Sequence, residues 1–504
     1  MSLLRPIFKQ AIFHPRQTAI VDDRGKASYA KVLGGALHIA KLIEKSTDAK
    51  HIGVMLPTGG AFPVCVLACW LADRVPVPIN YLLNRDDLHH VFADAKIDTL
   101  LTATPLIEHL VKNTAEDAIP GHIKQVALDQ LKFGKIPPLR WPRNPADDEL
   151  AVLLYTSGTS GKPKGVELTH RNLEANARAC IEHVHLTNCN IFLGVLPQFH
   201  TFGLTVLTLC PLLLGARVIY TARFVPRRIV ELMREHRPHI FVGVPSMYHA
   251  LLSVKSAKPE DFASLKYAIA GGEKLPTALD EKYRTQFGLQ LYEGYGLTET
   301  SPVCNWSVPD RHRKGSVGPT LPGVTNLILD ENNRPLPEDA EGEIAIVGDH
   351  VMRGYHGLTE LTGQVIVEVE HEGQNVRAFK TGDIGKRDAD GFLFITGRKK
   401  EMLIVAGENV FPRQIEEVLD KHPHVLASAI VGAPDVARGE VPVAFVELCD
   451  DFDQSTFDAN DVRTYCRTHL PPFMVPREIN VIETLPRNPT GKILRRELKV
   501  AQPA

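Results

Sequence analysis

The sequence contains no apolar run long enough to cross a membrane. Its two most apolar segments, residues 62–72 and 204–214, fall short of the roughly 18 residues that a spanning helix needs, so we expect both to be buried elements. Residues 1–11 lack the apolar core and the small-residue cleavage site of a secretory signal. We therefore expect neither a transmembrane segment nor a secreted protein.

The chain also lacks a strong charge bias. Its 57 Lys and Arg nearly balance its 59 Asp and Glu, which gives a formal net charge of −2. This balance argues against a protein that binds nucleic acid or a membrane surface through bulk charge. Low-complexity tracts and repeats of a solenoid period are absent as well.

The cysteines lack the spacing of a disulfide framework. Eight of them are scattered along the chain, which favours a reducing compartment, so we expect a cytoplasmic protein and leave peripheral membrane contact open. Cys180, His183, His185 and Cys189 lie close together, but their spacing matches no standard zinc site. We expect no metal there.

What the sequence does contain is a repeated order of apolar run, Gly-rich turn and amphipathic stretch, which is typical of βαβ units. Strands are expected at residues 151–155, 240–244, 267–270 and 289–292. Pro276 is expected to open a helix and Gly288 to end it. With 504 residues, 44% of them hydrophobic, the chain is predicted to be an α/β protein whose large N-terminal domain holds mostly parallel sheets covered by helices.

The pattern changes after about residue 310. Residues 330–333 and 390–391 predict the hairpin turns of a β-rich subdomain. Further on, the sequence predicts a helix from Pro412, strands at 427–431 and 443–447, and a helix at 461–469. The basic stretch at residues 397–400 is the candidate junction. We therefore predict a large domain at residues 1–397 and a small, mobile α+β domain at residues 398–504.

The strongest local signal is a loop rich in small and cationic residues, which reads Tyr155-Thr-Ser-Gly-Thr-Ser-Gly-Lys-Pro-Lys-Gly165. Its N–H groups and hydroxyls can cradle phosphate oxygens, and Lys162 and Lys164 add positive charge. It is not a Walker A loop, because Pro163 follows Lys162 where Ser or Thr is needed. A flexible surface loop is the alternative, but the preceding buried strand and the two lysines favour phosphate binding.

Three further segments carry groups suited to a nucleotide. Tyr295 offers an aromatic face, Thr298 a hydroxyl, and Glu299 a hard oxygen ligand of the kind that Mg²⁺ prefers. Asp383, at a predicted tight turn, could accept both hydroxyls of a ribose, although Asp is also a common turn former. Lys492 follows a Thr-Gly turn that would project its side chain.

In this order, these segments resemble the adenylate-forming superfamily of acyl-CoA synthetases, luciferases and peptide-synthetase adenylation domains, most closely the fatty acyl-CoA and acyl-ACP synthetases. The resemblance covers nearly the whole chain. The matching segments are residues 155–165, 197–203, 270–274, 292–300, 342–346, 381–383, 397–401, 407–412 and 488–492. Residues 354–362 depart from the family pattern because they lack a proline after the tyrosine, and we expect only a surface difference there.

The resemblance implies an enzyme that uses ATP, Mg²⁺ and CoA. A carboxylic acid would be activated as an acyl-adenylate with release of pyrophosphate, and the acyl group would then pass to a thiol. The implied phosphate-binding residues are Thr156, Ser157, Gly158, Thr159, Ser160, Gly161 and Lys164. The implied adenine and ribose residues are Gly272, Glu273, Lys274, Glu293, Tyr295, Gly296, Asp383 and Arg398. The implied catalytic residues are Lys492, Thr298, Glu299 (also the magnesium ligand) and His200. Lys400 matches the hinge, and Gly407 matches the loop that lines the thiol channel.

The acid itself is predicted less directly. His200 matches a gating position, and its expected neighbours are apolar: Phe199, Phe202, Gly203, Leu204, Pro245, Met247 and Tyr248. No Asp lies between Asp148 and Asp261 to bind an ammonium group, so we expect a fatty or similar apolar acid.

Several alternatives stay open. The acceptor could be the phosphopantetheine of an acyl carrier protein, and luciferase-type oxygenation uses the same adenylate. A non-catalytic nucleotide- or lipid-binding scaffold would be expected to have lost at least one of Glu299, Asp383, Arg398 and Lys492, and all four are present. We expect no nucleic-acid partner, and a monomer or a homodimer.

Overall fold

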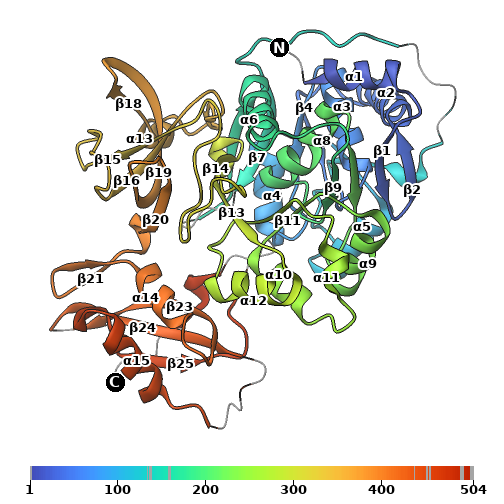
Figure 1. Cartoon of the computed structure of the whole chain (residues 1–504). Coiled ribbons are helices and arrows are strands. Elements are labelled where there is room, and N and C mark those ends of the chain that lie inside the picture. Colours follow the sequence, from blue (N-terminus) through green and yellow to red (C-terminus); the bar gives the residue numbers. More distant parts are fainter. Residues whose placement is uncertain are drawn as a thin grey trace.

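The computed structural model describes residues 3–132, 134, 139–156, 161–435, 437–449, 452, 456–487 and 493–499. Figure 1 shows a larger part, coloured blue to ochre, and a smaller C-terminal part in orange and red. None of the helices in the described ranges is long and apolar enough to cross a membrane. The α/β fold class is confirmed, with strand-rich subdomains and a smaller C-terminal part.

The largest sheet has eight strands in the order β14-β13-β12-β11-β9-β10-β1-β2. Its strands are β1 (Thr18–Asp22), β2 (Gly25–Ser28), β9 (Ile191–Gly194), β10 (Arg217–Tyr220), β11 (Ile240–Gly243), β12 (Tyr267–Gly271), β13 (Leu291–Gly296) and β14 (Val303–Trp306). The six strands from β13 to β1 are parallel to one another, whereas the edge strands β14 and β2 pair antiparallel. The carboxyl ends of the parallel strands therefore meet at one edge of the sheet, where ligands bind in open α/β folds.

Helices cover both faces of this sheet, because its central strands are apolar on both sides. Phe192 and Val242 belong to one core, whereas their neighbours Leu193 and Phe241 belong to the other. The second core is covered by α9 (Pro226–His236), α10 (Pro245–Leu252), α11 (Pro259–Phe262) and α12 (Thr277–Phe287). The first is covered by α1 (Leu4–Phe13), α2 (Tyr29–Ser46), α3 (Ala61–Leu71), α6 (His170–His183), α7 (Thr201–Leu204) and α8 (Cys210–Leu214). This two-sided burial is why these strands are continuous apolar runs in the sequence.

Two smaller sheets lie beside this core in the larger part. A parallel sheet has the order β4-β3-β5-β6, and an antiparallel one has the order β17-β8-β7. Their strands are β3 (His51–Val54), β4 (Val75–Pro78), β5 (Thr99–Thr102), β6 (Lys124–Ala127), β7 (Leu150–Thr156), β8 (Lys164–Thr169) and β17 (Gly354–Tyr355), and the parallel sheet packs with α4 (Arg85–Asp94) and α5 (Thr104–Asn113). The strand expected at 151–155 is confirmed, but it pairs antiparallel with β8, so the loop between them joins a hairpin and not a βαβ unit.

The remaining sheets are mainly antiparallel. One has the order β15-β16-β19-β18 with β20 on β19, and the C-terminal one has the order β22-β21-β24-β23 with β25 parallel to β24. The strands are β15 (Thr325–Leu329), β16 (Gly342–Val347), β18 (Ile366–His371), β19 (Gln374–Arg387), β20 (Leu393–Arg398), β21 (Leu403–Val405), β22 (Glu408–Val410), β23 (Val425–Asp435), β24 (Gly439–Leu448) and β25 (Glu478–Val481). The helices are α13 (Thr359–Val365), α14 (Pro412–Leu419) and α15 (Ala459–His469).

Most predicted element ends agree with the structure, with small shifts. Gly288 ends α12 in the left-handed conformation, as expected, but Pro276 is the residue before the first turn and the helix begins at Thr277. The strand expected at 289–292 begins at Leu291 and continues to Gly296. The last shift matters most, because it carries Tyr295 and Gly296 to the sheet edge within a strand.

Candidate functional site

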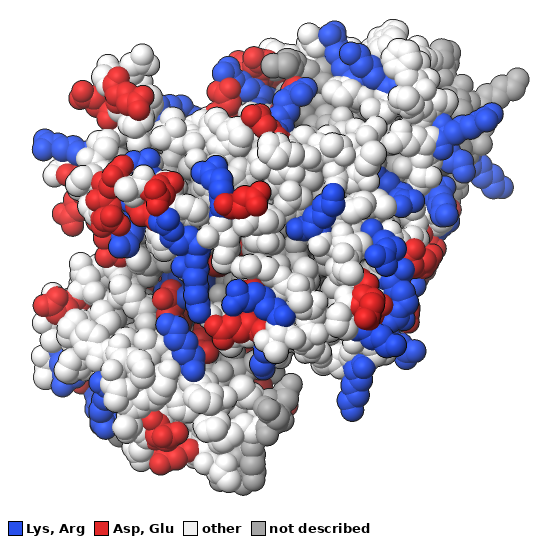
Figure 2. All heavy atoms as spheres, viewed as in Figure 1, with Lys and Arg blue, Asp and Glu red and all other residues white. Residues whose placement is uncertain are grey.

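A cavity of about 690 Å³ lies between the carboxyl edge of the large sheet and the C-terminal part. Its lining includes eight of the residues expected at a nucleotide site: Gly272, Glu273, Lys274, Glu293, Tyr295, Gly296, Asp383 and Arg398. From the other side it is lined by α14 residues such as Arg413, Glu416 and Glu417. Figure 2 shows acidic and basic side chains interspersed where the two parts meet, without a field of one sign.

Tyr295, Asp383 and Arg398 form one connected group in this cavity. The Tyr295 hydroxyl donates to Asp383 Oδ2 over 2.7 Å, and Arg398 Nε lies 2.7 Å from Asp383 Oδ1. Asp383 and Arg398 face each other across the β19–β20 pair, and Asp383 is only 2% exposed. The charge of Asp383 raises the pKa of Arg398, so the guanidinium stays protonated. A buried carboxylate held by two donors keeps lone pairs available for further hydroxyl groups.

The slot beside this group is shaped by close backbone approaches. A Cβ atom at Gly296 would lie 1.9 Å from Pro302 O, so only glycine fits between the end of β13 and the following turn. Glu293 accepts a hydrogen bond from Leu275 N at 3.0 Å, which ties β13 to the loop after β12. Burial raises the pKa of Glu293 and lowers the pKa of Lys274. Lys274 forms an ion pair with Glu417 of α14, across the cavity.

The phosphate loop is described only at its two ends. Ser157, Gly158, Thr159 and Ser160 lie outside the described residues, whereas Thr156 and Lys164 pair across the β7–β8 hairpin. Lys164 Nζ is 5.7 Å from the ring centroid of Tyr355 in β17, which pairs with β8. Gly161 has a positive φ of 150°. The hairpin thus brings a lysine and the base of the loop next to β17.

Glu299 lies against this hairpin in a short 3-10 turn, Thr298–Thr300. Its carboxylate accepts a hydrogen bond from the Tyr355 hydroxyl at 2.7 Å, and its backbone oxygen accepts one from Met352 N. Thr298, beside it, is buried. The structure therefore groups Lys164, Tyr355 and Glu299, which the sequence separates by up to 191 positions (355 minus 164).

The donor set around Glu299 fits a magnesium ion that is held mainly by phosphate. Within the part of the chain that the structure describes, no three His, Cys, Asp or Glu side chains converge to hold a metal by themselves. Mg²⁺ typically binds one or two carboxylates and takes its other ligands from substrate phosphates and water. A single carboxylate next to a phosphate loop is consistent with that mode.

Sequence reasoning missed Tyr355. The surface difference expected at 354–362 concerns the proline that is missing between Tyr355 and Glu360, where residues 357–360 are exposed. Tyr355 itself was assigned no role. β17 pairs with β8, and Tyr355 donates directly to Glu299. Burial, with the Glu299 charge beside it, raises the pKa of the Tyr355 phenol, so it remains a donor at neutral pH. Tyr355 is visible in the sequence, but only the missing proline of this segment was considered there.

His200 lies at the carboxyl edge of the same sheet, after β9. It precedes α7, and its Nδ1 accepts from Phe202 N at 3.4 Å. Burial lowers the pKa of His200 to about 4, so the ring is neutral at pH 7. Phe202 packs on Gly271, where a Cβ atom would come within 2.8 Å of the ring. His200 does not line the 690 Å³ cavity, and lies two strands away from β12 in the sheet order.

The residues expected around the acyl group have different surroundings. Tyr248 is 1% exposed, and its hydroxyl lies 3.0 Å from both Phe241 O and Ile269 O, so its ring belongs to the core under α10. Phe199 packs edge-on against Tyr81 at 5.3 Å between ring centroids, and Pro245 lines the cavity. Tyr248, Phe199 and Pro245 thus lie in three different places, which are the core under α10, the contact with Tyr81 and the cavity lining.

The remaining predicted residues lie outside the cavity or outside the described ranges. Lys492 is not among the described residues, although Arg487 and Ile493 on either side of its segment are. Lys400 lies exposed in the short turn Lys399–Glu401 after β20. Gly407 lies at the tip of the β21–β22 hairpin with a φ of +86° and open space around it. The structure does not bring Lys400 and Gly407 to the nucleotide slot.

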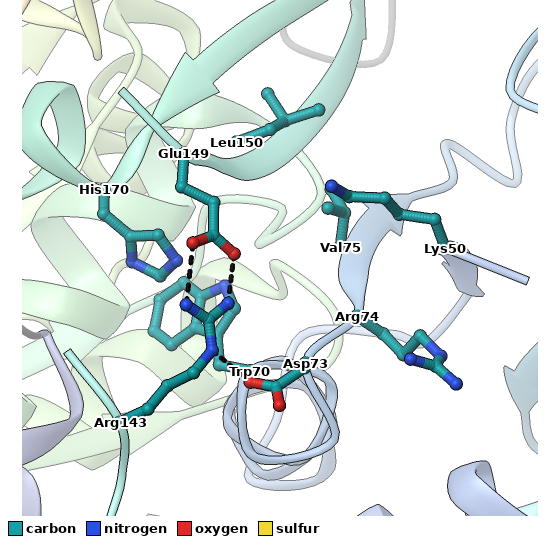
Figure 3. A pocket seen from close by; sticks show the side chains of 9 residues that line it. All are labelled: Lys50, Trp70, Asp73, Arg74, Val75, Arg143, Glu149, Leu150 and His170. Atoms are coloured by element: carbon teal, nitrogen blue, oxygen red, sulfur yellow. Dashed lines mark hydrogen bonds and ion pairs between the residues drawn. The ribbon is translucent and has the colours of Figure 1, made fainter. Parts of the chain in front are cut away.

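A second recess shares no residue with this cavity. Its volume is about 10 Å³, enough for roughly one water molecule. Figure 3 shows Arg143 aimed at both Glu149 and Asp73, beside Trp70 and His170. The guanidinium is already shared between two carboxylates, so this recess is an ion-pair network that holds the segment before β7 and not a ligand site.

Comparisons with known proteins agree with this geometry. A model of the AMP-binding enzyme family matches residues 7–356, and a model of the AMP-binding enzyme C-terminal domain matches residues 414–492. A long-chain-fatty-acid–CoA ligase of Yersinia pestis is 36% identical over 89% of this chain and 84% of its own length. A feruloyl-CoA synthase of an Amycolatopsis species is 30% identical over 97% of each.

Solved structures agree as well. ATP-bound MatB from Rhodopseudomonas palustris superposes with a TM-score of 0.86 at 27% identity, over 98% of each chain. The sequence-based resemblance is thus confirmed. The chain belongs to the AMP-binding enzyme family, the superfamily of adenylate-forming ligases.

Proposed function

We propose that this protein is an ATP-dependent acid–CoA ligase that activates an apolar carboxylic acid, in particular a fatty acid. It would form an acyl-adenylate with release of pyrophosphate and then transfer the acyl group to CoA. The observation that carries the proposal is the group Tyr295–Asp383–Arg398 in a cavity at the carboxyl edge of the sheet. This group offers an aromatic face for the base and a buried carboxylate for the ribose hydroxyls, and the two lie within hydrogen-bonding distance of each other.

In this proposal, Asp383 and Arg398 bind the ribose, while Tyr295 and Gly296 line the adenine slot with Gly272, Glu273, Lys274 and Glu293. The β- and γ-phosphates are held by the loop: Thr156, Ser157, Gly158, Thr159, Ser160, Gly161 and Lys164. Glu299 would hold Mg²⁺, which neutralises phosphate charge when bound. Thr298 touches the α-phosphate.

Lys492 stabilises the charge that builds up between the acid and the α-phosphate in the transition state. Phosphoryl and nucleotidyl transfer depends mainly on such positioning and charge neutralisation. The same lysine is dispensable once the adenylate has formed, because the second step attacks carbon and not phosphorus.

The fatty-acid assignment rests on the apolar surroundings of His200. Phe199 and Phe202 flank it, its ring is neutral because burial lowers its pKa to about 4, and the sequence holds no Asp from residue 149 to residue 260. An ammonium group on the acid would lack an Asp partner there. The relatives act on different acids by name, fatty and feruloyl among them, so the acid must be identified by experiment.

CoA is favoured over a carrier protein as the acceptor. A large acidic protein would need a basic rim near residues 397–413, but three of the four cations there are engaged by the chain's own carboxylates. These pairs are Arg398 with Asp383, Lys399 with Glu343, and Arg413 with Glu417. Lys400 would serve as the hinge of a small domain that starts at residue 398, and Gly407 would line the thiol channel after that domain turns.

A cytoplasmic location is supported by the cysteines, all eight of which lie in the described ranges without forming a disulfide. Peripheral contact with a membrane is supported by exposed aromatic rings beside the first helix: Phe13 is 72% exposed, and Trp141, which lies 6.1 Å from Phe8 between ring centroids, is 64% exposed.

The proposal is tested by acid-dependent ATP–pyrophosphate exchange over acids from acetate to palmitate, with benzoates, ferulate and amino acids included. Exchange with aliphatic acids that disappears in Lys492→Ala is the expected result, and CoA or acyl carrier protein added afterwards identifies the acceptor. Folded protein that binds ATP but exchanges with none of these acids would leave only a scaffold function.

A further inference from the structure

The first helix has an exposed side that carries cations and apolar groups together. Its other side is buried in the first core, where α1 packs on α2 and α8. The exposed side is formed by Arg5, Lys9, Ile12 and Phe13. Phe13 is 72% exposed and Ile12 is 38% exposed. Residues 1–21 contain no Asp or Glu, so no carboxylate of this segment offsets its cations, although the charge of the whole chain is nearly balanced.

Trp141 extends this surface from a distant segment of the chain. Its ring lies 6.1 Å from the ring of Phe8 between centroids, and it is 64% exposed. Phe8 and Ile12 are about one helical turn apart on the same side of α1, so Trp141 borders the exposed side of the helix. Leu139, two residues earlier, is 49% exposed. Aromatic and aliphatic groups thus lie next to the cations of α1.

The neighbours of Trp141 hold it in this exposed position. Arg140 Nη1 lies 2.8 Å from Glu44 Oε1 of α2, and Arg143 forms an ion pair with Glu149 ahead of β7. These two arginines are engaged within the chain, so the cations that can meet a partner are those of α1. A large ring that is held at the surface between two anchored residues indicates a contact with something outside the chain.

The combination fits the surface of a bilayer that contains anionic lipids. Trp and Phe insert at the headgroup level of a membrane, and Lys and Arg beside them are attracted to anionic headgroups. A second copy of the chain fits less well, because a two-fold contact would bring the cations of both copies into one patch. A single-stranded nucleic acid stacks on aromatic rings but gains little from Ile12 and Leu139.

We propose that the exposed side of α1, together with Trp141, is a docking surface for an anionic lipid bilayer. Figure 1 shows α1 at the top of the view, at the end of the larger part that lies away from the C-terminal part. Docking there leaves the C-terminal part clear of the bilayer. The link to catalysis rests on the proposed function: a long-chain acid dissolved in the bilayer would reach the enzyme at the surface on which it is docked.

Sedimentation with vesicles tests the lipid class. Wild-type protein should bind vesicles of phosphatidylglycerol and phosphatidylcholine in equal parts, and bind pure phosphatidylcholine about 100-fold more weakly, because Arg5, Lys9 and Arg16 lose their attraction. Arg5→Gln/Lys9→Gln should weaken binding to the mixed vesicles about 30-fold, with a smaller salt dependence. Phe13→Ser should weaken it about tenfold at low and at high salt, because an apolar contact is not screened.

Helix α9 offers the matched controls, because it covers the opposite face of the large sheet. Arg227→Gln/Arg228→Gln removes two cations whose side chains are 82% and 44% exposed, and Val225→Ser removes an apolar side chain that is 49% exposed. Neither control should change vesicle binding. The proposal is wrong if the controls weaken binding as much as the α1 variants do, if both kinds of vesicle bind equally, or if neither binds.

Tryptophan fluorescence shows directly which surface meets the lipid. All three tryptophans lie in the described ranges, and Trp70 and Trp306 are only 5% and 2% exposed, so Trp141 is the one that lipid can reach. Mixed vesicles should shift its emission to the blue, and lipids with brominated acyl chains should quench it. Trp141→Phe should still bind but lose both signals. Binding of the wild-type protein without quenching would place the contact on another surface and overturn the proposal.

Two further outcomes would name a different partner. A dimer that Phe13→Ser dissociates would identify a second copy of the chain, and binding of poly(U) in place of vesicles would identify a nucleic acid; either result overturns the proposal. The binding assays do not require catalysis. Protein that docks on mixed vesicles but shows no pyrophosphate exchange would therefore contradict only the proposed reaction, whereas active protein that does not bind vesicles would contradict only the docking surface.

Discussion

Replacing Tyr355 by phenylalanine tests the arrangement around Glu299. The substitution removes one hydroxyl, which donates to the Glu299 carboxylate over 2.7 Å, and leaves the ring that Lys164 Nζ approaches at 5.7 Å. Hydrogen bonds to charged groups contribute about 1.5–3 kcal/mol, and Tyr355 is only half-buried, so the lower value applies. About 1.5 kcal/mol corresponds to roughly a tenfold change in an equilibrium constant.

The assay is ATP–pyrophosphate exchange as a function of magnesium concentration. We expect the half-saturating magnesium concentration to rise about tenfold in Tyr355→Phe, because Glu299 loses the bond that orients it. Tyr267→Phe is the matched control: it removes a hydroxyl that donates to Val184 O at 3.0 Å, also from a half-buried ring, and should leave the magnesium dependence unchanged. The reasoning would be refuted if Tyr355→Phe kept the wild-type magnesium dependence. It would also be refuted if Tyr355→Phe raised the half-saturating magnesium concentration by the same factor in a Glu299→Gln background.

Three further changes test other parts of the molecule. Asp383→Asn removes the charge that pairs with Arg398 and should lower exchange activity about 100-fold, whereas Asp390→Asn, in the turn of the same hairpin, should not. Gly407→Ala places a side chain at a φ of +86°, at a cost of about 1 kcal/mol, and should slow acyl transfer to CoA while exchange stays normal. Burial lowers the pKa of three histidines, His170, His200 and His350, to about 4. The unfolded chain takes up their protons at a higher pH than the folded chain, so the melting temperature should fall as the pH drops from about 6.5 to 4. Burial raises the pKa of Asp420 to about 7, so Asp420 opposes this trend. Asp420→Asn should therefore steepen the fall in melting temperature with decreasing pH, and His350→Asn should make it shallower. A melting temperature that does not depend on pH would contradict the lowered pKa of these histidines.

The sequence predicted those elements whose burial or ends can be read directly from their residue types. Strands such as β11 and β12 are apolar on both faces, and Gly288 ends α12 as the residue type suggests. The sequence does not predict which strand a given strand pairs with. The strand at 150–156 pairs antiparallel with β8 because the phosphate loop is short enough to close a hairpin, and nothing in its own residues distinguishes that pairing from a parallel one.

The candidate site was predicted where one residue type has one obvious chemical role. Tyr295, Asp383 and Arg398 lie together as the resemblance implied, although β13 is distant in the sequence from the β19–β20 hairpin. Contacts between parts were not predictable, because they depend on how two separately folded surfaces meet. The hydrogen bond from Ile493 N to Glu273 is of this kind. Tyr355 beside Glu299 is a contact within the larger part, and it depends on the pairing of β17 with β8.

The distribution of the thiols gives this chain a built-in test of whether the cavity opens. Six of the eight cysteines are buried, and the two others lie on different parts: Cys189 is exposed after α6, and Cys449, at the end of β24, lines the cavity. Maleimide dyes should therefore label the native protein at one position on each part. The unmodified sequence then carries a donor–acceptor pair, and the distance between the two dyes can be recorded with ATP, with the acid and with CoA, without introducing a single cysteine.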